Sequence, residues 1–344
     1  MENFPNRYLF FVGIDLSKTY FDATLLNQNA KKVAYEQFKN TTVGCEEFLQ
    51  WVQQKTVHLE QVLFCMEHTG IYGRLVQHFL QDHQAALWMD SGVQIKYCLG
   101  VQRGKNDRID SFRIASYAFT RCHLGRLTPI YDTQIELLHD LLSCRNRLLG
   151  AYNTLKTAQE ETKDFAPTSY STLKEIQTKA FEGMKSSLQE LDAQINVLIE
   201  KNPDWQTNLN LALSIKGLGK MTVLWLLVYT RNFSQEFNAR RVAALIGVAP
   251  YAIQSGTSID KGTHTSNFAH QHLKVILHMA AMAAIRCNPA IKIYYKRKKE
   301  EGKNGLLVLN NVKNKLIHQL LAVVRSKQLF DPDFLHPRAQ LKAV

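Results

Sequence analysis

Three closely spaced strand-like segments in the first 40 residues are the feature that most constrains the fold of this chain. Residues 8–15 form an almost continuous apolar run, and residues 20–26 and 33–38 follow after turns of only a few residues. Short apolar runs bounded by polar turn residues are typical of buried strands. Because such short connections join antiparallel neighbours, the segment predicts a three-stranded meander.

The next eighty residues alternate between helix and strand patterns. In chain order the sequence predicts a helix over 43–54, a strand over 61–66, a helix over 71–83, a strand over 85–89 and a helix over 107–120. An antiparallel meander followed by β-α-β elements predicts a ribonuclease-H-like α/β domain over residues 1–125.

The rest of the chain is predicted to be mainly helical. Apolar residues between Leu173 and Leu198 recur mostly every three or four positions, which predicts a coiled-coil seam in a helical middle domain, residues 126–203. A plain helical hairpin packed on a neighbouring domain fits equally well, and either would serve as a spacer or an oligomerisation arm. The sequence predicts a third, mainly helical domain over residues 204–344, in which a polar loop over 254–267 interrupts the helices.

The excess positive charge lies in the last two fifths of the chain. The net charge is +12, yet residues 1–200 hold 21 Lys+Arg against 23 Asp+Glu, whereas residues 201–344 hold 21 against 7. Such asymmetry favours a C-terminal part that binds a polyanion, because Lys and Arg replace counterions on a phosphate backbone. The densest cluster follows two tyrosines and comprises Lys296, Arg297, Lys298 and Lys299. A solvated helix face is the alternative interpretation.

Composition also limits the cellular setting. The sequence has no apolar run near the ~20 residues that a membrane helix requires, no signal-peptide pattern and no basic amphipathic helix with an aromatic face. Its six cysteines are scattered without a C-x-x-C pair, which argues against a disulfide framework or a zinc site. We therefore expect a cytoplasmic, nucleoid-associated protein that binds nucleic acid and no membrane.

Four acidic residues stand at the ends of predicted elements. Asp15 and Glu67 end two predicted strands, while Asp107 and Asp110 lie three apart at a helix start and so share a face. If the two strands are neighbours, the four carboxylates converge at one sheet edge, where they would bind Mg²⁺ or Mn²⁺. Two such ions can clamp the attacking and leaving oxygens of a phosphodiester. Each acid alone could equally be structural, and Asp107 could be a helix N-cap.

A nucleotide-binding interpretation of the same region is weaker. Residues 13–19 have the place of the first phosphate loop of an actin-like ATPase, but that loop needs glycine where this chain has Ser17. No second glycine-rich loop follows, so we expect no nucleotide cofactor.

Two loops of the C-terminal part carry candidate chemistry. Ser255 lies beside Gly256, which leaves room for a large substrate, and a serine hydroxyl can form a covalent ester. Gly217 and Gly219, followed by Lys220, would let backbone N–H groups face a DNA phosphate, as in a helix-hairpin-helix. A simple hydroxyl-rich loop and a helix-breaking turn are the respective alternatives.

These motifs together resemble one known family, the DEDD transposases of insertion sequences, which are bridge-RNA-guided recombinases related to the pilin-gene invertase. The resemblance extends from Tyr8 to about Phe330 and rests on the order of segments 13–15, 67–72, 105–110, 214–219, 247–250 and 254–256. Departures from the family pattern occur at Asp90-Ser91, Asn106, Ser111, Lys216 and Lys274. None changes the type of a catalytic residue.

The resemblance implies a RuvC-like N-terminal domain, a coiled-coil middle and a C-terminal transposase domain. It implies that Asp15, Glu67, Asp107 and Asp110 are the metal-binding tetrad and that Ser255 is the nucleophile, which forms a 5′-phosphoserine link to DNA. It also implies homodimers and tetramers with composite sites, and a structured noncoding guide RNA that pairs with donor and target DNA.

The sequence therefore predicts a DNA transposase or site-specific recombinase. Lys105, Arg108 and the Lys296 cluster are expected phosphate contacts. Three alternatives stay open: a DNA invertase of the same family, a RuvC-like junction nuclease in which water attacks, and a catalytically inactive nucleic-acid-binding protein.

Overall fold

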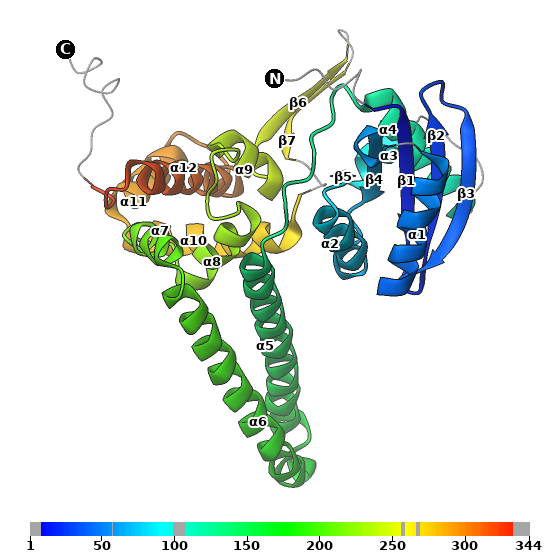
Figure 1. Cartoon of the computed structure of the whole chain (residues 1–344). Coiled ribbons are helices and arrows are strands. Elements are labelled where there is room, and N and C mark those ends of the chain that lie inside the picture. Colours follow the sequence, from blue (N-terminus) through cyan, green and yellow to red (C-terminus); the bar gives the residue numbers. More distant parts are fainter. Residues whose placement is uncertain (1–7, 57, 99–106, 256–258, 266–268, 333–344) are drawn as a thin grey trace, which may run out of the picture. The chain divides into compact units, whose positions relative to one another are not determined.

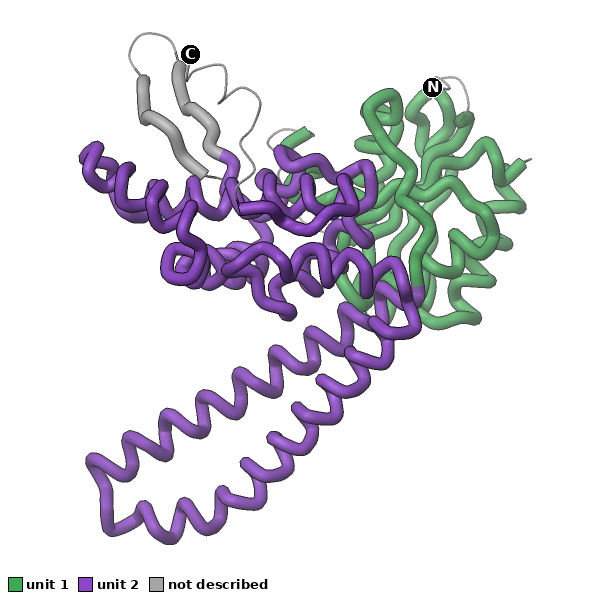
Figure 2. Tube along the Cα trace, turned by 90° about the vertical axis from the view of Figure 1, so that its left-hand side faces the viewer, with its two compact units in different colours: residues 1–132 green, residues 133–344 purple. Residues whose placement is uncertain are grey.

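The computed structural model describes residues 8–56, 58–98, 107–255, 259–265 and 269–332, with only the backbone described for residues 250–265. The chain divides into two compact units, residues 1–132 and residues 133–344, coloured green and purple in Figure 2.

A five-stranded mixed sheet forms the centre of the first unit (Figure 1). Its strands lie in the order β3-β2-β1-β4-β5. Strand β2 is antiparallel to both β1 and β3, whereas β1, β4 and β5 run parallel. The bounds are β1 Phe10–Leu16, β2 Tyr20–Asn27, β3 Lys32–Lys39, β4 Val62–Glu67 and β5 Ala86–Asp90. This arrangement confirms the predicted meander and the mixed α/β character of the N-terminal part.

Helices cover both faces of the sheet. On one face, α1 (Thr42–Lys55) and α2 (Arg74–Asp82) pack on a core that includes Phe21, Phe48 and Phe64. On the other face, α3 (Gly92–Cys98) and α4 (Asp107–Arg121) pack on a second core around Trp88 and Ile114. Two short 3-10 turns, η2 (Leu59–Gln61) and η3 (Gly70–Gly73), precede β4 and α2. Strand residues alternate between these two cores, as the period of a strand requires.

Two long antiparallel helices open the second unit (Figure 1). Helix α5 (Thr133–Phe165) and helix α6 (Pro167–Glu200) are separated by Ala166, and Pro167 starts α6, where its missing N–H is harmless. Between the helices, Arg145 forms a two-point ion pair with Asp192 at 2.6 and 3.2 Å. The hairpin agrees with both interpretations of the apolar spacing, a coiled-coil seam and a plain helical hairpin.

The C-terminal helices share one core with the base of the hairpin. Leu138 and Leu142 of α5 and Ile195 and Ile199 of α6 are buried in the same cluster as Trp225. The contributing elements are α7 Pro203–Leu213, α8 Lys220–Tyr229, α9 Ala239–Ile246, α10 Gln271–Cys287, α11 Pro289–Glu300 and α12 Gly305–Ser326. None of the helices in the described residues has the length and apolar character needed to cross a membrane.

The prediction of a polar loop over residues 254–267 is wrong in one respect, because most of this segment belongs to a β-hairpin. Strand β6 (Pro250–Ser255) pairs antiparallel with β7 (Ile259–Thr265). The β-branched residues Ile259, Thr263 and Thr265 favour extended backbone, but the threonine hydroxyls make the segment look like a polar loop.

Candidate active site

Asp15 and Glu67 are brought to one edge by neighbouring strands. Strands β1 and β4 are parallel, with Ile14 opposite Met66, so the next residues, Asp15 and Glu67, both lie where these strands end. The carboxyl ends of parallel strands meet at the same sheet edge, where sites of α/β proteins commonly form. Asp15 also lies directly opposite Asp22 in the β1–β2 register, which puts the two side chains on one face.

Helix α4 carries Asp107 and Asp110 across that face. The helix rests on Gly13, where an added Cβ would come within 2.2 Å of the Ser111 carbonyl oxygen. The hydroxyls of Thr24 and Ser111 lie 2.8 Å apart and fix the helix to β2 as well. Both acids lie in the first turn of α4, where a negative charge interacts favourably with the helix dipole. Asp110 also accepts a hydrogen bond from Arg113 at 2.7 Å.

The acids interact electrostatically with Asp15. Burial, together with the negative charges of Asp110, Asp107, Asp22 and Glu67, raises the pKa of Asp15 to about 6. Each contribution favours the neutral form, since ionised Asp15 is both partly desolvated and repelled. The tetrad that was predicted from the sequence is therefore close enough to act on one carboxyl group.

The donor chemistry of this cluster fits a divalent cation. Carboxylate oxygens are the ligands that Mg²⁺ and Mn²⁺ prefer, and a cation would offset the repulsion that raises the pKa of Asp15. Among the residues that the structure describes, however, no three His, Cys, Asp or Glu side chains converge closely enough to hold an ion. The fit thus rests on donor type and charge, and not on ligand geometry.

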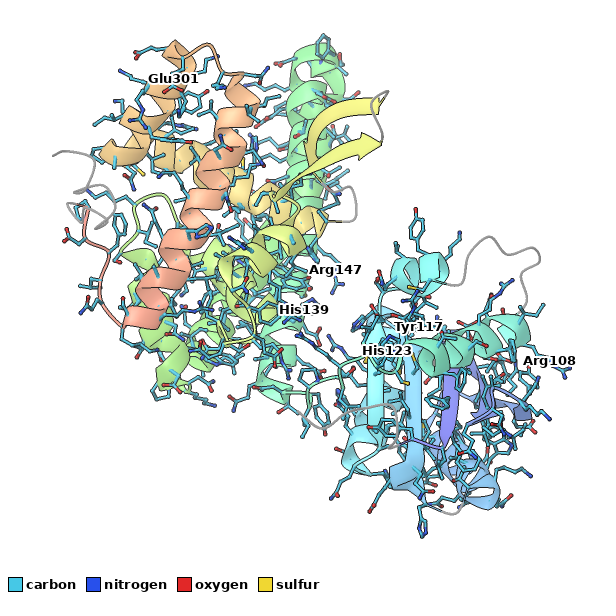
Figure 3. All side chains as sticks on the ribbon, turned by 90° about the horizontal axis from the view of Figure 1, so that it is seen from above. Arg108, Tyr117, His123, His139, Arg147 and Glu301 are labelled. Atoms are coloured by element: carbon cyan, nitrogen blue, oxygen red, sulfur yellow. The ribbon has the colours of Figure 1, made fainter. Side chains whose placement is uncertain are left out.

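A glycine makes room for the Glu67 carboxylate. Gly92, at the start of α3, lies so close that an added Cβ would be 1.9 Å from Glu67 Oε1. Asp90, which is paired with Glu67 across β4 and β5, accepts a hydrogen bond from the Tyr117 hydroxyl at 2.7 Å. Figure 3 labels Tyr117 and Arg108, which both belong to α4. Neither Gly92 nor Asp90 was among the predicted site residues.

Asp22 is a further acid that sequence reasoning missed. It is buried and accepts hydrogen bonds from the Tyr35 hydroxyl at 2.5 Å and from Gln37 Nε2 at 3.2 Å. The Tyr35 ring in turn lies 4.9 Å from both Lys32 Nζ and Arg108 Cζ. The short turn between the first two predicted strands already places residue 22 opposite residue 15, so hairpin register was the signal that could have found it.

Ser255 belongs to the second unit and ends strand β6. Its backbone lies opposite Ile259, next to the turn of the hairpin. Both ends of the hairpin are fixed to the helical core: Asn310 Nδ2 donates to the Val248 carbonyl at 2.9 Å, and the His270 N–H donates to the Leu245 carbonyl at 3.0 Å. Gly256, like Lys105, lies outside the described residues.

The turn before α8 contains two glycines whose surroundings differ. Gly217 has φ +110° and lies against α10, where an added Cβ would be 2.6 Å from Ala284 Cα. Gly219 borders open space at the N-cap of α8, and the Lys220 ammonium donates to the Asn196 side chain. Close helix packing accounts for Gly217, whereas Gly219 keeps an accessible helix N-terminus.

The basic cluster lies on α11, and a nearby carboxylate partly neutralises its positive charge. Lys298 Nζ is 2.6 Å from Glu301, and Arg297 Nε is 3.9 Å from the same carboxylate, whose residue is labelled in Figure 3. The Arg297 guanidinium also lies 5.9 Å from the Tyr294 ring. Lys296 and Lys299 are exposed, so they remain accessible to a phosphate backbone.

Comparisons with known proteins agree with this arrangement. The sheet order and the acids at its edge are consistent with a RuvC-like domain. Residues 12–162 match the model of the DEDD transposase domain, and residues 209–296 match the model described as transposase, IS116/IS110/IS902 family. The chain belongs to this family of insertion-sequence transposases, as its motifs indicated. Cleavage and rejoining of DNA is the activity that this family implies.

Three relatives illustrate the range of the family. The pilin gene-inverting proteins of Moraxella lacunata and Moraxella bovis are each 27% identical over 325 residues, covering 93% of this chain and 97% of theirs. An insertion element IS110 uncharacterized 43.6 kDa protein of Streptomyces coelicolor (strain ATCC BAA-471 / A3(2) / M145) is 32% identical over 142 residues, which is 41% of this chain and 34% of that protein.

Proposed function

We propose that this transposase cuts and rejoins DNA through a covalent 5′-phosphoserine at Ser255, assisted by divalent metal at Asp15, Glu67, Asp107 and Asp110. The observation that carries the proposal is the placement of acids from three elements around Asp15; burial and the charges of these acids together raise the pKa of Asp15 to about 6. Such a cluster is a typical environment for phosphoryl-transfer chemistry, because it needs a cation to neutralise it.

The chemistry of the proposed step balances without an external energy source. The Ser255 oxygen forms a bond to the scissile phosphorus, and the bond between phosphorus and the 3′-oxygen breaks. The serine hydroxyl gives up its proton, and the departing strand ends as a 3′-OH after taking one up. A bound Mg²⁺ or Mn²⁺ would polarise the phosphate and favour the ionised serine. Rejoining reverses these bonds at a new partner strand, so ATP is not required.

The remaining chain is assigned to assembly and nucleic-acid binding. We propose that homodimers or tetramers bring the acids of one subunit to the serine of another, and that residues 126–203 act as a coiled-coil or spacer arm between the domains 1–125 and 204–344. Lys220 and the cluster Lys296, Arg297, Lys298 and Lys299, together with Arg108 and Lys105, would hold donor and target DNA and a structured guide RNA. The proposed place of action is the cytoplasm.

A covalent trap tests the central step. Purified protein is incubated with Mg²⁺, guide RNA and DNA from the flanks of its gene, then denatured and assayed for protein–DNA adducts. We expect adducts with wild type and with Ser258→Ala, an identical change three residues further along the chain, and none with Ser255→Ala or Asp15→Asn. Metal-dependent cutting that persists in Ser255→Ala would replace this proposal with the junction nuclease. No adduct and no cutting with wild type, together with equal DNA binding by wild type and Asp15→Asn, would point to an inactive binding protein.

Inversion is the second candidate outcome, because two long relatives are named pilin gene-inverting proteins. A plasmid that carries the native flanks in both orientations separates the two outcomes. Transposition yields excised circles and new insertions, whereas inversion yields only the reoriented segment. Treatment of the protein with ribonuclease before the assay tests the guide RNA, since a protein that selects DNA alone would keep its activity.

A further inference from the structure

A buried lysine stands without a partner in the helical core of the second unit. Lys313 lies on α12 and is only 6% exposed. Within the described part of the chain, its ammonium group has no hydrogen bond and no ion pair. The ammonium is not among the fully enclosed polar atoms that lack a partner, so its stem is buried while an anion can still reach its charge. Partial burial of a charge that nothing pairs is unfavourable, and a bound anion would remove that cost.

The groups nearest to Lys313 add positive charge and do not compensate it. Helices α10 and α12 pack against each other, and α10 carries Lys274 and His278 one turn apart. Burial and the charge of Lys274 lower the pKa of Lys313, while burial and the charge of Lys313 lower the pKa of His278. Within the described residues, no carboxylate contributes to the pKa shift of either group.

The cluster also lies near the positive end of a helix. Lys274 is the fourth residue of α10, whose N-terminus is capped by His270 through its ring nitrogen, 3.3 Å from the Leu273 N–H. A helix N-terminus favours anions, and cations are normally found at the other end. The placement of Lys274 there is therefore unfavourable unless a negative group joins it.

The β6–β7 hairpin, which contains Ser255, is called the serine hairpin here. Both of its ends are attached to the helices that carry this cluster. Asn310 lies one turn before Lys313 on α12 and binds the carbonyl of Val248, two residues before β6. His270 precedes α10 and follows β7 by only a few residues. The cationic cluster is thus built into the base of the element that ends in Ser255.

We propose that Lys313, Lys274 and His278 form a binding site for a backbone phosphate of nucleic acid at the base of the serine hairpin. The inference rests on the proposed function for its biological setting. Phosphate is the anion that the surrounding region suits, because residues 201–344 carry three times as many basic as acidic residues. In the free protein the positive charge of Lys313 is unfavourable, because burial and the charge of Lys274 both disfavour it. A bound phosphate would pair with this charge.

The variant Lys313→Met separates a binding role from a structural one. It keeps a long apolar stem and removes the unpaired charge, so the free protein should melt at an equal or higher temperature. Affinity for a 30-base-pair duplex from the element end, measured by fluorescence anisotropy, should fall by roughly tenfold, and the slope of log affinity against log salt should shrink by about one. Lys315→Met, an identical change at an exposed position on the same helix, is the matched control.

The outcomes distinguish the ligand and the underlying function. Affinity lost for the duplex assigns the site to DNA, and affinity lost only for the transcribed flanking RNA assigns it to the guide. A lower melting temperature with unchanged affinity for both would overturn the site. Lys274→Met combined with Lys313→Met should weaken binding less than the two separate effects together, because both hold one phosphate. The Ser255 adduct assay is an independent test. If adducts form but Lys313→Met binds nucleic acid as wild type does, the proposed function stands and the phosphate site is wrong. If Lys313→Met binds more weakly but no adducts form, the phosphate site stands and the proposed function is wrong.

Discussion

Asp15 links the chemistry of the site to the stability of its domain. The pKa of its carboxyl group is about 6 in the folded protein and 3.8 without the fold, so the folded state binds the proton more tightly. The free energy of unfolding therefore falls as the pH rises from about 4 through 6 and stays lower above that. Burial of the Asp15 charge, together with repulsion from the neighbouring acids, thus destabilises the metal-free domain at neutral pH.

We predict that Asp15→Asn abolishes strand cleavage and yet stabilises the metal-free protein at pH 7.5. The amide keeps the shape of the side chain and removes its charge, which should raise the free energy of unfolding by on the order of 1 kcal/mol, a value reduced for solvent screening. Urea unfolding in EDTA at pH 7.5 and at pH 4 measures the effect. The gain should shrink toward pH 4, where wild-type Asp15 is protonated; an equal gain at both values would contradict an electrostatic origin.

At the level of elements, the contact between β1 and α4 sets the geometry of the acids. Gly13 lets the backbone of α4 come so close that an added Cβ would lie 2.1 Å from the Ala115 nitrogen. Asp15 stands two residues further along β1, and Asp110 stands one turn before the contact on α4. A displaced helix would therefore move two of the four acids relative to the other two.

We predict that Gly13→Ala destabilises the protein by roughly 2 kcal/mol and lowers cleavage more than it lowers DNA binding. The clash is with backbone atoms, which cannot rotate away, so the helix must shift as in other overpacked cores. Gly150→Ala is the control: Gly150 lies in α5 with no atom near its Cβ position, and alanine there should stabilise by about 1 kcal/mol. Thermal unfolding and the adduct assay measure both variants. Full activity in Gly13→Ala would show that the acids tolerate movement of α4.

The sequence could predict elements whose residues carry a local pattern. The apolar runs of β1 and β4 and the acids that end them were visible because burial on both faces produces continuous apolar strands. Helix α3 was missed because its seven residues bury only Ile95 and so show no period. Asp22 was missed because its role comes from strand register, and the β6–β7 hairpin because its threonines and serine look like a loop. Non-local contacts therefore account for most of what the sequence did not indicate.

At the scale of the whole molecule, the long hairpin changes character along its length. The apolar series that begins at Leu173 is buried at its far end, where Ile195 and Leu198 join the core. Toward the α5–α6 turn the same series is exposed, and 68% of the Ile176 surface is accessible to solvent. Phe165, which ends α5 at this turn, is 87% exposed. Isolated apolar residues at a surface are ordinary, but large ones at the tip of a 33-residue helix are well placed for a second copy of the chain.

We predict that Phe165→Glu combined with Ile176→Glu weakens self-association at least tenfold without unfolding the hairpin. Charged residues at these exposed positions should leave helix content unchanged, yet they would be desolvated in an interface between two tips. Size-exclusion chromatography with light scattering over a range of concentrations gives the association constant, and circular dichroism gives the helix content. Ser171→Glu, also exposed and polar from the start, should associate as the wild type does. If the double variant remains as oligomeric as the wild type, the subunits associate through another surface and the hairpin acts only as a spacer.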